Sequence, residues 1–530
     1  MVMKLIDREI LNINENICQN IELATSYKRG FVSQNILSQL RNLIEHIAIK
    51  CYSEGHDIEN KYENIGKALA FVKSRAHLRF INNFHKLLQI VASHYTLDQD
   101  KSERLMLKYY EYLLRIRSFL LENYGLQVLY NLEQFPLFTD SELKEYYEKI
   151  AAKMEALHTS NLQTSHTDRY YIHMIKPFFI NQKVYYEVTF LRATDQASKF
   201  DRVIAFTKND ISQNYSVKLL LNEVYIEVLG KAMPIQIITN WEVSIRPCEL
   251  KNFSRVFGLN ITVQTGATEY RNLMNYLTKT GMTLVELVEA PEEYYISIKN
   301  QVTDNGKTAK IFGVLDRCRD LITKNQPGSN VVRYLLYRLN NKVIKRQLSL
   351  DQCNKLSYLY LEYGCIPFDE MPFCSSLINH NPRLVDVFSC MDHIGREHEL
   401  LARYIKNNTE IEGQLYTPKS EITEFTELEN LVEKYNGALY YKHGNRKLNL
   451  YRDYIYIQGY EEATLQIIRI LMELAGNGIK GYFQAVDSWL QSNPDHAVDC
   501  PDKREALKDM FEHSRVAFIY GSAGTGKTTL

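Results

Sequence analysis

The stretch RVAFIYGSAGTGKTTL, residues 515–530, contains the most specific pattern in the chain. Its apolar run Val516–Tyr520 predicts a short strand, and DKREALKDMF, residues 502–511, predicts a helix just before it. The strand runs directly into the spacing Gly521-x4-Gly526-Lys527-Thr528. A strand, a glycine-rich loop of this spacing and a following helix form the start of an α/β domain whose loop binds phosphate. We therefore expect residues 501–530 to hold the first strand and P-loop of an NTPase domain.

The residue types of this loop fit ATP and Mg2+. Glycines allow the backbone to curl tightly and to turn its N–H groups toward phosphate oxygens. Lys527 is expected to reach the β and γ phosphates, and the Thr528 hydroxyl to hold the Mg2+ that accompanies the nucleotide. These two residues are the expected catalytic residues. The predicted nucleotide-binding residues are Gly521, Ser522, Ala523, Gly524, Thr525, Gly526, Lys527, Thr528 and Thr529.

GSAGTGKTT, residues 521–529, together with REAL, residues 504–507, resembles motif I of superfamily-one helicases of the UvrD and RecD kind. The resemblance covers about residues 501–530. Where the family often has an adenine-contacting glutamine, this chain has Pro501-Asp502-Lys503. AAA-type ATPases rank second, because their loop more often contains a proline.

The helicase resemblance implies ATP hydrolysis, with a Walker B aspartate and a water-orienting acid downstream of the P-loop. Both acids would follow residue 530. We therefore expect the chain to be a fragment of a longer helicase, truncated just after motif I and inactive as an ATPase by itself.

Residues 1–158 are predicted to form a helical bundle. In FVSQNILSQLRNLIEHIAIKCY, residues 31–52, apolar side chains recur with the period of an amphipathic helix. Residues 101–125 repeat that character, and Gly125 is the expected stop of the helix. Several amphipathic helices in so short a region indicate a bundle.

The helix over residues 31–52 also carries a polar group of side chains. Arg41, Asn42, Glu45 and His46 fall within about 140° of helical arc, opposite the apolar stripe. One interpretation is metal-independent RNA cleavage, with His46 as acid or base and Arg41 holding the phosphate. The other is a solvated helix face with an Arg41–Glu45 ion pair.

The Arg41/His46 spacing resembles the R-x4-6-H motif of HEPN ribonucleases, which often has a polar residue after the arginine, as Asn42 is here. The resemblance implies a helical bundle whose site forms across a homodimer. It also implies pairing with ATPases or helicases in bacterial defence systems. A second match, Arg79/His85, is followed by Phe80 and fits less well.

The rest of the chain changes period twice. Residues 165–265 are rich in β-branched and aromatic residues and predict a β-rich module of about five strands. Residues 266–420 predict a second helical region. Residues 421–500 predict a small α/β connector with strands around the turn signal His443-Gly444-Asn445. The expected fold class is α+β multidomain, ending in an incomplete α/β NTPase domain.

Composition narrows the class of protein. The 530 residues include 63 Lys and Arg and 63 Asp and Glu, so the formal net charge is zero. A protein that coats nucleic acid is expected to carry a large positive charge, which argues against that class. The N-terminus has no signal-peptide pattern, and no apolar run reaches the roughly 18 residues that span a bilayer. Nine scattered cysteines without a C-x-x-C pair fit reduced thiols. We therefore expect a cytoplasmic protein without a membrane partner.

Three functional hypotheses follow. The first is the N-terminal part of an ATP-dependent helicase or translocase, bacterial and in phage defence, acting on DNA or RNA. The second is a HEPN-type ribonuclease coupled to a P-loop ATPase, with a homodimer formed through the N-terminal helical region. The third is a partner-binding scaffold whose ATPase serves signalling.

Overall fold

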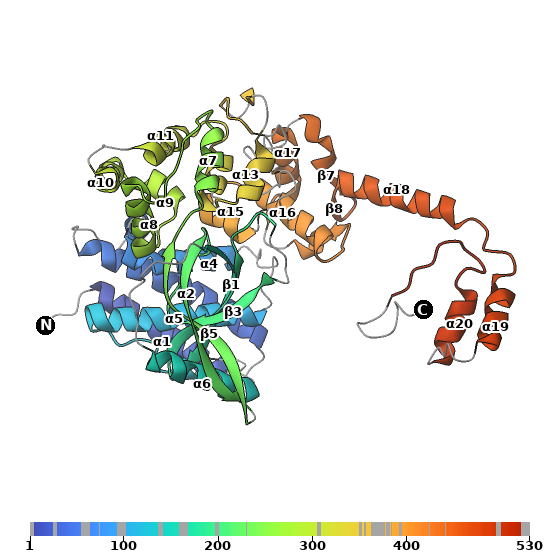
Figure 1. Ribbon diagram of the computed structural model, residues 1–530, viewed down its shortest axis with the longest axis horizontal. Helices are drawn as coiled ribbons and strands as arrows, with labels where there is room; N and C mark the ends of the chain where they lie inside the picture. Colours follow the sequence, from blue (N-terminus) through green and yellow to red (C-terminus); the bar gives the residue numbers. More distant parts are fainter. Residues whose placement is uncertain are drawn as a thin grey trace. The chain divides into compact units, whose positions relative to one another are not determined.

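The computed structural model describes residues 5–24, 29–54, 64–73, 75–92, 102–135, 141–157, 168–196, 201–228, 230–304, 309–348, 352–354, 357–361, 377, 382, 384–391, 395–422, 425–439, 441–493 and 500–520. Helices and strands are mixed, so the α+β class expected from the sequence is confirmed (Figure 1). The chain divides into two compact units. Unit 1 comprises residues 1–407 and 424–427, and unit 2 comprises residues 408–423 and 428–530.

The helices have the following bounds: α1 Leu5–Ala24, α2 Arg29–Ser53, α3 Ile65–Lys73, α4 Arg79–Ala92, α5 Ser102–Tyr124, α6 Ser141–Ala156, α7 Pro247–Arg255, α8 Thr268–Thr280, α9 Leu284–Glu289, α10 Glu292–Thr303, α11 Lys310–Thr323, α12 Ser329–Tyr337, α13 Asn341–Gln347, α15 Leu384–Cys390, α16 Glu397–Glu410, α17 Leu428–Ala438, α18 Gln458–Ala475, α19 Tyr482–Ser492 and α20 Pro501–Asp509. The strands are β1 Tyr170–Ile180, β2 Lys183–Arg192, β3 Val203–Thr207, β4 Val217–Val228, β5 Lys231–Val243, β6 Thr417–Pro418, β7 Leu448–Tyr451 and β8 Tyr454–Ile457.

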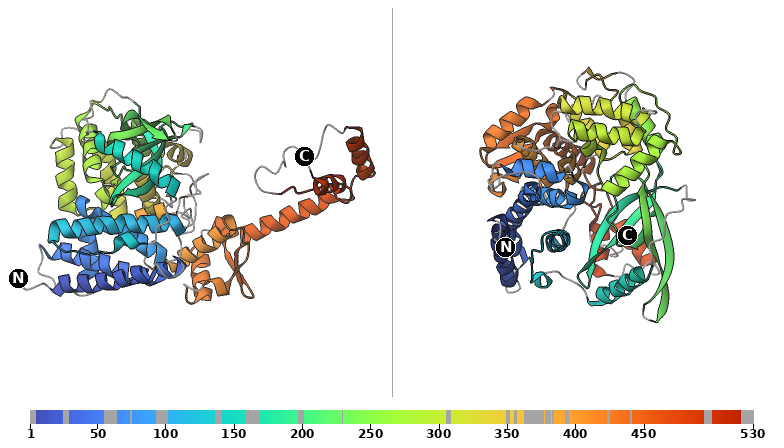
Figure 2. Two further views of the ribbon diagram at one scale, coloured as in Figure 1. Left: turned by 90° about the horizontal axis from the view of Figure 1, so that it is seen from below. Right: turned by 90° about the vertical axis from the view of Figure 1, so that its left-hand side faces the viewer.

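Helices α1–α5 share one apolar core, and Figure 2 shows them lying side by side. Leu40, Leu43, Ile44 and Ile47 of α2 are fully buried, so the apolar stripe expected on this helix faces the core. Helix α5 ends at Tyr124. Gly125 follows with φ of 65°, and its N–H donates to the carbonyl oxygen of Leu121. This is the left-handed helix end for which glycine is favoured.

Strands β1–β5 form a closed barrel in the order β1-β2-β3-β5-β4. Neighbouring strands are antiparallel except β3 and β5, which are parallel. Strands β1, β2 and β3 follow one another, and β4 returns to lie beside β1, which is the Greek-key order. The β-rich module expected from the sequence is therefore a five-stranded Greek-key barrel.

The β1–β2 hairpin lies between α6 and the α1–α5 bundle. Its two-residue turn, Asn181–Gln182, has φ of 49° and 62°, as a type I′ turn requires. Side chains alternate along each strand, so the hairpin presents two faces. Phe178, Ile180 and Tyr185 share a core with α6, whereas Phe179 and Val184 pack against the core of the α1–α5 bundle.

Unit 2 contains a three-stranded sheet in the order β6-β8-β7, covered by α17. The hairpin expected around His443-Gly444-Asn445 is wrong in position. Residues 441–446 form a 3-10 turn, and the strands β7 and β8 meet at residues 452–453. Arg452 takes the left-handed φ of 52° there. This closer turn lets the buried side chains Leu448 and Ile455 lie on the same side of the sheet.

Candidate functional site

The predicted P-loop residues, Gly521 to Thr529, lie outside the residues that the structure describes. The structure does describe the segment that leads into them. Helix α20, Pro501–Asp509, occupies the place where the sequence predicts a helix. Val516–Tyr520 is not paired as a strand within the described residues, so the expected strand is not formed in this structure. The physical reason is that a β-strand requires a hydrogen-bonded neighbour.

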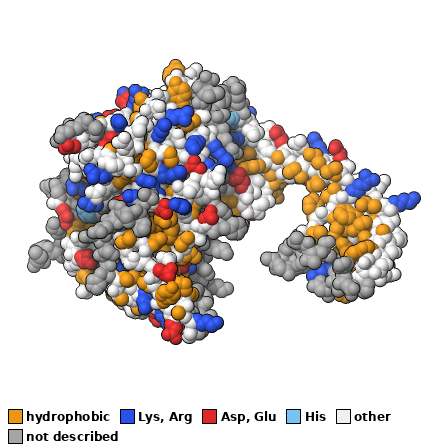
Figure 3. Space-filling view, viewed as in Figure 1, with side chains coloured by type: hydrophobic (Ala, Val, Ile, Leu, Met, Phe, Trp, Pro, Cys, Tyr) orange, Lys and Arg blue, Asp and Glu red, His pale blue; other side chains and the backbone are white. Residues whose placement is uncertain are grey.

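Unit 2 exposes an unusual amount of apolar surface. Within the described residues, no side chain of α18, α19 or α20 is buried. Figure 3 shows hydrophobic side chains gathered along α18 and over the α19–α20 end. In the segment before the loop, Phe518 is 75% exposed and Tyr520 is 94% exposed. The exposed large hydrophobic residues of this surface are Leu465, Ile467, Ile468, Ile470, Met472, Leu474, Ile479, Trp489, Phe518, Ile519 and Tyr520. Exposed apolar side chains in this number are typical of an interaction surface.

The polar side chains of α2 contact two neighbouring helices, α4 and α1. Arg41 Nε donates to Glu45 Oε1 at 2.9 Å, and His85 Nε2 of α4 lies 3.2 Å from the same oxygen. The Arg41–Glu45 pair of the second interpretation is present, and Asn42 is exposed, but the Glu45 carboxylate is buried, with Glu45 only 6% exposed. Burial raises the pKa of Glu45, but the hydrogen bonds from His85 and Arg41 outweigh it, and the pKa is lowered.

His46 points toward α1 and away from this cluster. Its Nδ1 donates to the backbone carbonyl oxygen of Asn42 at 2.7 Å, and its Nε2 lies 3.5 Å from the Glu9 carboxylate. The structure therefore brings Arg41, Glu45 and His85 into contact, whereas the contacts of His46 are made with Asn42 and Glu9.

The second R-x4-6-H match, Arg79/His85, makes contacts of a structural kind. His85 is buried against Glu45, and Arg79 Nη2 pairs with Glu286 of α9 at 2.7 Å. Glu286 also accepts from the backbone N–H of Thr283 at 2.9 Å, so it closes the first turn of α9. Arg79 thereby links the α1–α5 bundle to the second helical region.

A polar cluster that sequence reasoning missed lies where β1 meets α7. Glu249 is fully buried in α7; its carboxylate accepts from the Arg246 backbone N–H at 3.1 Å and from the Tyr171 hydroxyl. Arg246 Nη1 donates to Tyr171 Oη at 3.1 Å and to Asp195 at 2.8 Å. Burial raises the pKa of Glu249 to about 7. Only a fold that joins positions 171, 195 and 249 could reveal this cluster.

Glu249 predicts a pH dependence of stability. Its folded pKa of about 7 lies above the ordinary value of 4.5. The unfolded chain therefore loses this proton first as the pH rises. The contribution of Glu249 to the free energy of unfolding is fully present below pH 4.5 and is lost by about pH 7. The expected loss is about 3 kcal/mol.

The measurement is urea unfolding of the natural chain and of Glu249→Gln between pH 4.5 and pH 7. The stability of the natural chain relative to Glu249→Gln should fall as the pH rises, because the amide does not titrate. Glu293→Gln, at an exposed position of α10, is the matched control. Parallel pH profiles of the natural chain and Glu249→Gln would contradict the prediction.

Comparison with known proteins gave no match, whether with family models, with curated proteins or with solved structures. Among the described residues, every helix is too short or too polar to cross a lipid bilayer.

Proposed function

We propose that this chain belongs to an ATP-dependent nucleic-acid translocase of the helicase type, and that residues 501–530 open its P-loop NTPase domain. The observation that carries the proposal is the order of helix, apolar segment and Gly521-x4-Gly526-Lys527-Thr528. ATP and Mg2+ are the cofactors that such a loop binds. DNA or RNA is the proposed polymer.

The exposed apolar surface of unit 2 supports this proposal. An α/β NTPase domain buries the strand that precedes its P-loop within a parallel sheet. Phe518 and Tyr520 have the apolar character of such a strand and are solvent-exposed within the described residues. Pairing of Val516–Tyr520 with neighbouring strands of that sheet would cover both side chains. The apolar side chains of α18 offer further surface for the same domain.

The test is ATP hydrolysis by the complete gene product with and without single-stranded DNA or RNA. A translocase hydrolyses ATP faster when it holds its strand, so we expect stimulation. Hydrolysis that no nucleic acid stimulates would refute the translocase and favour the signalling scaffold.

A HEPN-type ribonuclease is the second candidate, and one observation on α2 favours it. The Nδ1 of His46 donates to the carbonyl oxygen of Asn42, its Nε2 lies 3.5 Å from the Glu9 carboxylate, and the side chain is 25% exposed. The side chain of Arg41, five residues earlier, is 43% exposed. A partly exposed imidazole and guanidinium on one helix are the groups that metal-independent RNA cleavage requires.

For this candidate, His46→Ala is expected to reduce RNA cleavage by about 100-fold or more, because a general acid or base contributes at least that much. Cleavage of a labelled RNA by the complete gene product is the measurement. His77→Ala, at an exposed histidine of the same bundle, is the control. Equal cleavage by the natural protein and His46→Ala would remove Arg41 and His46 from consideration.

A further inference from the structure

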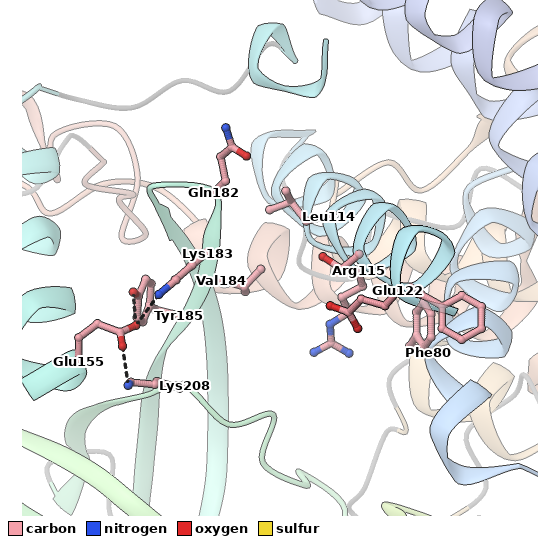
Figure 4. A pocket seen from close by; sticks show the side chains of 12 residues that line it. Phe80, Leu114, Arg115, Glu122, Glu155, Gln182, Lys183, Val184, Tyr185 and Lys208 are labelled. Carbon is pink, nitrogen blue, oxygen red and sulfur yellow. Dashed lines mark hydrogen bonds and ion pairs between the residues drawn. The ribbon is translucent and has the colours of Figure 1, made fainter. Parts of the chain in front are cut away.

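A groove of about 500 Å3 lies in unit 1 between the barrel and the α1–α5 bundle. One wall comes from α5, with Phe80 of α4 beside it, and the other comes from the β1–β2 turn and the start of β2 (Figure 4). Lys208, just after β3, and Glu155 of α6 complete it. The volume falls in the range of ordinary ligand sites.

The position of the groove on the barrel indicates the kind of ligand. Five-stranded Greek-key barrels of the OB type bind oligonucleotides and oligosaccharides over strands 2 and 3 and the adjoining loop between strands 1 and 2. The groove is lined by Gln182 of that loop, by Lys183 and Tyr185 of β2, and by Lys208 next to β3. The groove therefore lies over the part of the barrel at which barrels of this topology bind their ligands.

The charges in the groove favour a polyanion over an uncharged sugar chain. Lys183 Nζ and Lys208 Nζ share a single carboxylate, that of Glu155, at 3.4 Å and 3.0 Å. Hydrogen bonds from Lys208, Tyr185 and Lys183 hold the pKa of Glu155 down at about 2, so the carboxylate is ionised. With Arg115 and Glu122, the lining carries three cationic side chains and two carboxylates, which leaves one positive charge in excess. Exposed ion pairs of this kind contribute about 0–1 kcal/mol. A phosphate can therefore replace Glu155 as the partner of either lysine with little loss.

The opposite wall offers the apolar surface that nucleobases need. Phe80 and Phe119 pack edge to face, with ring centroids 5.5 Å apart, and both side chains are partly exposed. Aromatic side chains beside a positively charged groove are the combination that binds single strands, because bases stack while phosphates follow the cations. Duplexes keep their bases stacked inside and cannot use such a wall.

Two of the lining residues, Gln182 and Arg115, are held in place by neighbouring side chains. Arg117 of α5 donates to the Gln182 side chain at 3.0 Å, which ties the β1–β2 turn to the bundle. Arg115 pairs with Asp210 at 2.9 Å and with Glu111 at 3.2 Å. The groove is thus built before any ligand arrives, and its two exposed lysines are the adaptable part.

From these observations we propose that the groove between the β1–β2 hairpin and α5 binds single-stranded nucleic acid through its phosphates and bases. Lys183 and Lys208 contact phosphates, and the wall of Phe80 and Phe119 contacts bases. The assignment rests on the proposed function, because it gives the translocase a surface that holds its strand.

The test measures binding of labelled oligo(dT) and oligo(U) of about 12 nucleotides to the 530-residue chain by fluorescence anisotropy, without ATP. Lys183→Glu combined with Lys208→Glu is expected to weaken binding at least 10-fold. It should also reduce the slope of log affinity against log salt by about 1.4, since each phosphate contact contributes about 0.7 for single strands. Whichever of the two strands binds more tightly identifies the polymer.

Three comparisons make the test specific. The double variant Lys144→Glu with Lys153→Glu changes the net charge by the same amount as the Lys183/Lys208 double variant, but on α6 outside the groove. It should bind as the natural chain does. An abasic strand of the same length should bind at least 10-fold more weakly than oligo(dT), because it cannot stack. A duplex should also bind more weakly. Circular dichroism verifies that both double variants fold.

Equal affinity of the Lys183/Lys208 double variant and the natural chain would overturn the proposal, as would equal binding of the abasic strand. A failure of the proposed function can be distinguished from a failure of the groove assignment. Lys527→Ala should leave strand binding unchanged while ATP hydrolysis by the complete gene product is lost. Loss of the groove alone would leave unstimulated, Lys527-dependent hydrolysis in place.

Discussion

Replacing Lys527 with alanine is expected to reduce ATP hydrolysis by the complete gene product by about 100-fold or more. Removing one charged donor from developing negative charge in an active site has effects of this order. In the proposed P-loop, Lys527 reaches the β and γ phosphates, and no other side chain of the predicted loop carries a positive charge. Hydrolysis is measured as phosphate release at saturating single strand.

The control for Lys527→Ala is Lys508→Ala, in α20 just upstream of the loop, where the lysine pairs with Asp487 on the protein surface. It should hydrolyse ATP at a rate close to that of the natural protein. Undiminished hydrolysis by Lys527→Ala would show that this glycine-rich stretch is not the nucleotide site. Thr528→Ala should reduce hydrolysis and raise the Mg2+ concentration that the remaining hydrolysis requires, because Thr528 is the proposed metal ligand.

Replacing Glu286 with alanine is expected to lower the free energy of unfolding of unit 1 by about 3–5 kcal/mol, the range found when one partner of a buried ion pair is removed. Glu286 is 8% exposed and accepts from Arg79 at 2.7 Å. Burial raises its pKa, but Arg79 and Lys86 outweigh burial, so the pKa is lowered and the carboxylate is ionised. The alanine variant leaves both cations without this carboxylate.

Urea unfolding followed by circular dichroism measures the effect of Glu286→Ala. Glu293→Ala removes an exposed glutamate from α10 and should change stability by less than about 0.5 kcal/mol. Glu286→Gln keeps an oxygen for the Thr283 N–H and removes only the charge, so it separates the helix cap from the ion pair. A loss no larger than that of Glu293→Ala would contradict the prediction.

The fold was predictable where the pattern is local. The apolar period of residues 31–52 placed Leu40, Leu43 and Ile44 in the core, and they are fully buried. The β-branched segments of residues 165–265 predicted about five strands, and five are present. The turn in residues 441–457 was misplaced, because His443-Gly444-Asn445 has turn composition, whereas strand pairing selects residues 452–453.

The candidate sites divide in the same way. A P-loop is a run of adjacent residues, so its chemistry can be predicted from Gly521 to Thr529 without a fold. The Glu249 cluster and the groove combine positions far apart in sequence, such as Phe119, Lys183 and Lys208. No spacing rule relates such positions. The surroundings of Glu45 on α2 could not be predicted for the same reason, because His85 of α4 contacts this carboxylate beside Arg41.

The sequence by itself therefore determined the helical and β-rich segments and the glycine-rich spacing of residues 521–529 on which the proposed P-loop rests, because period and spacing are properties of neighbouring residues. Only the tertiary structure decided the Greek-key order of the barrel, the burial of Glu45, Glu249 and Glu286, and the groove beside the β1–β2 turn. These features depend on long-range packing and hydrogen bonding, whose energies are set by which elements meet.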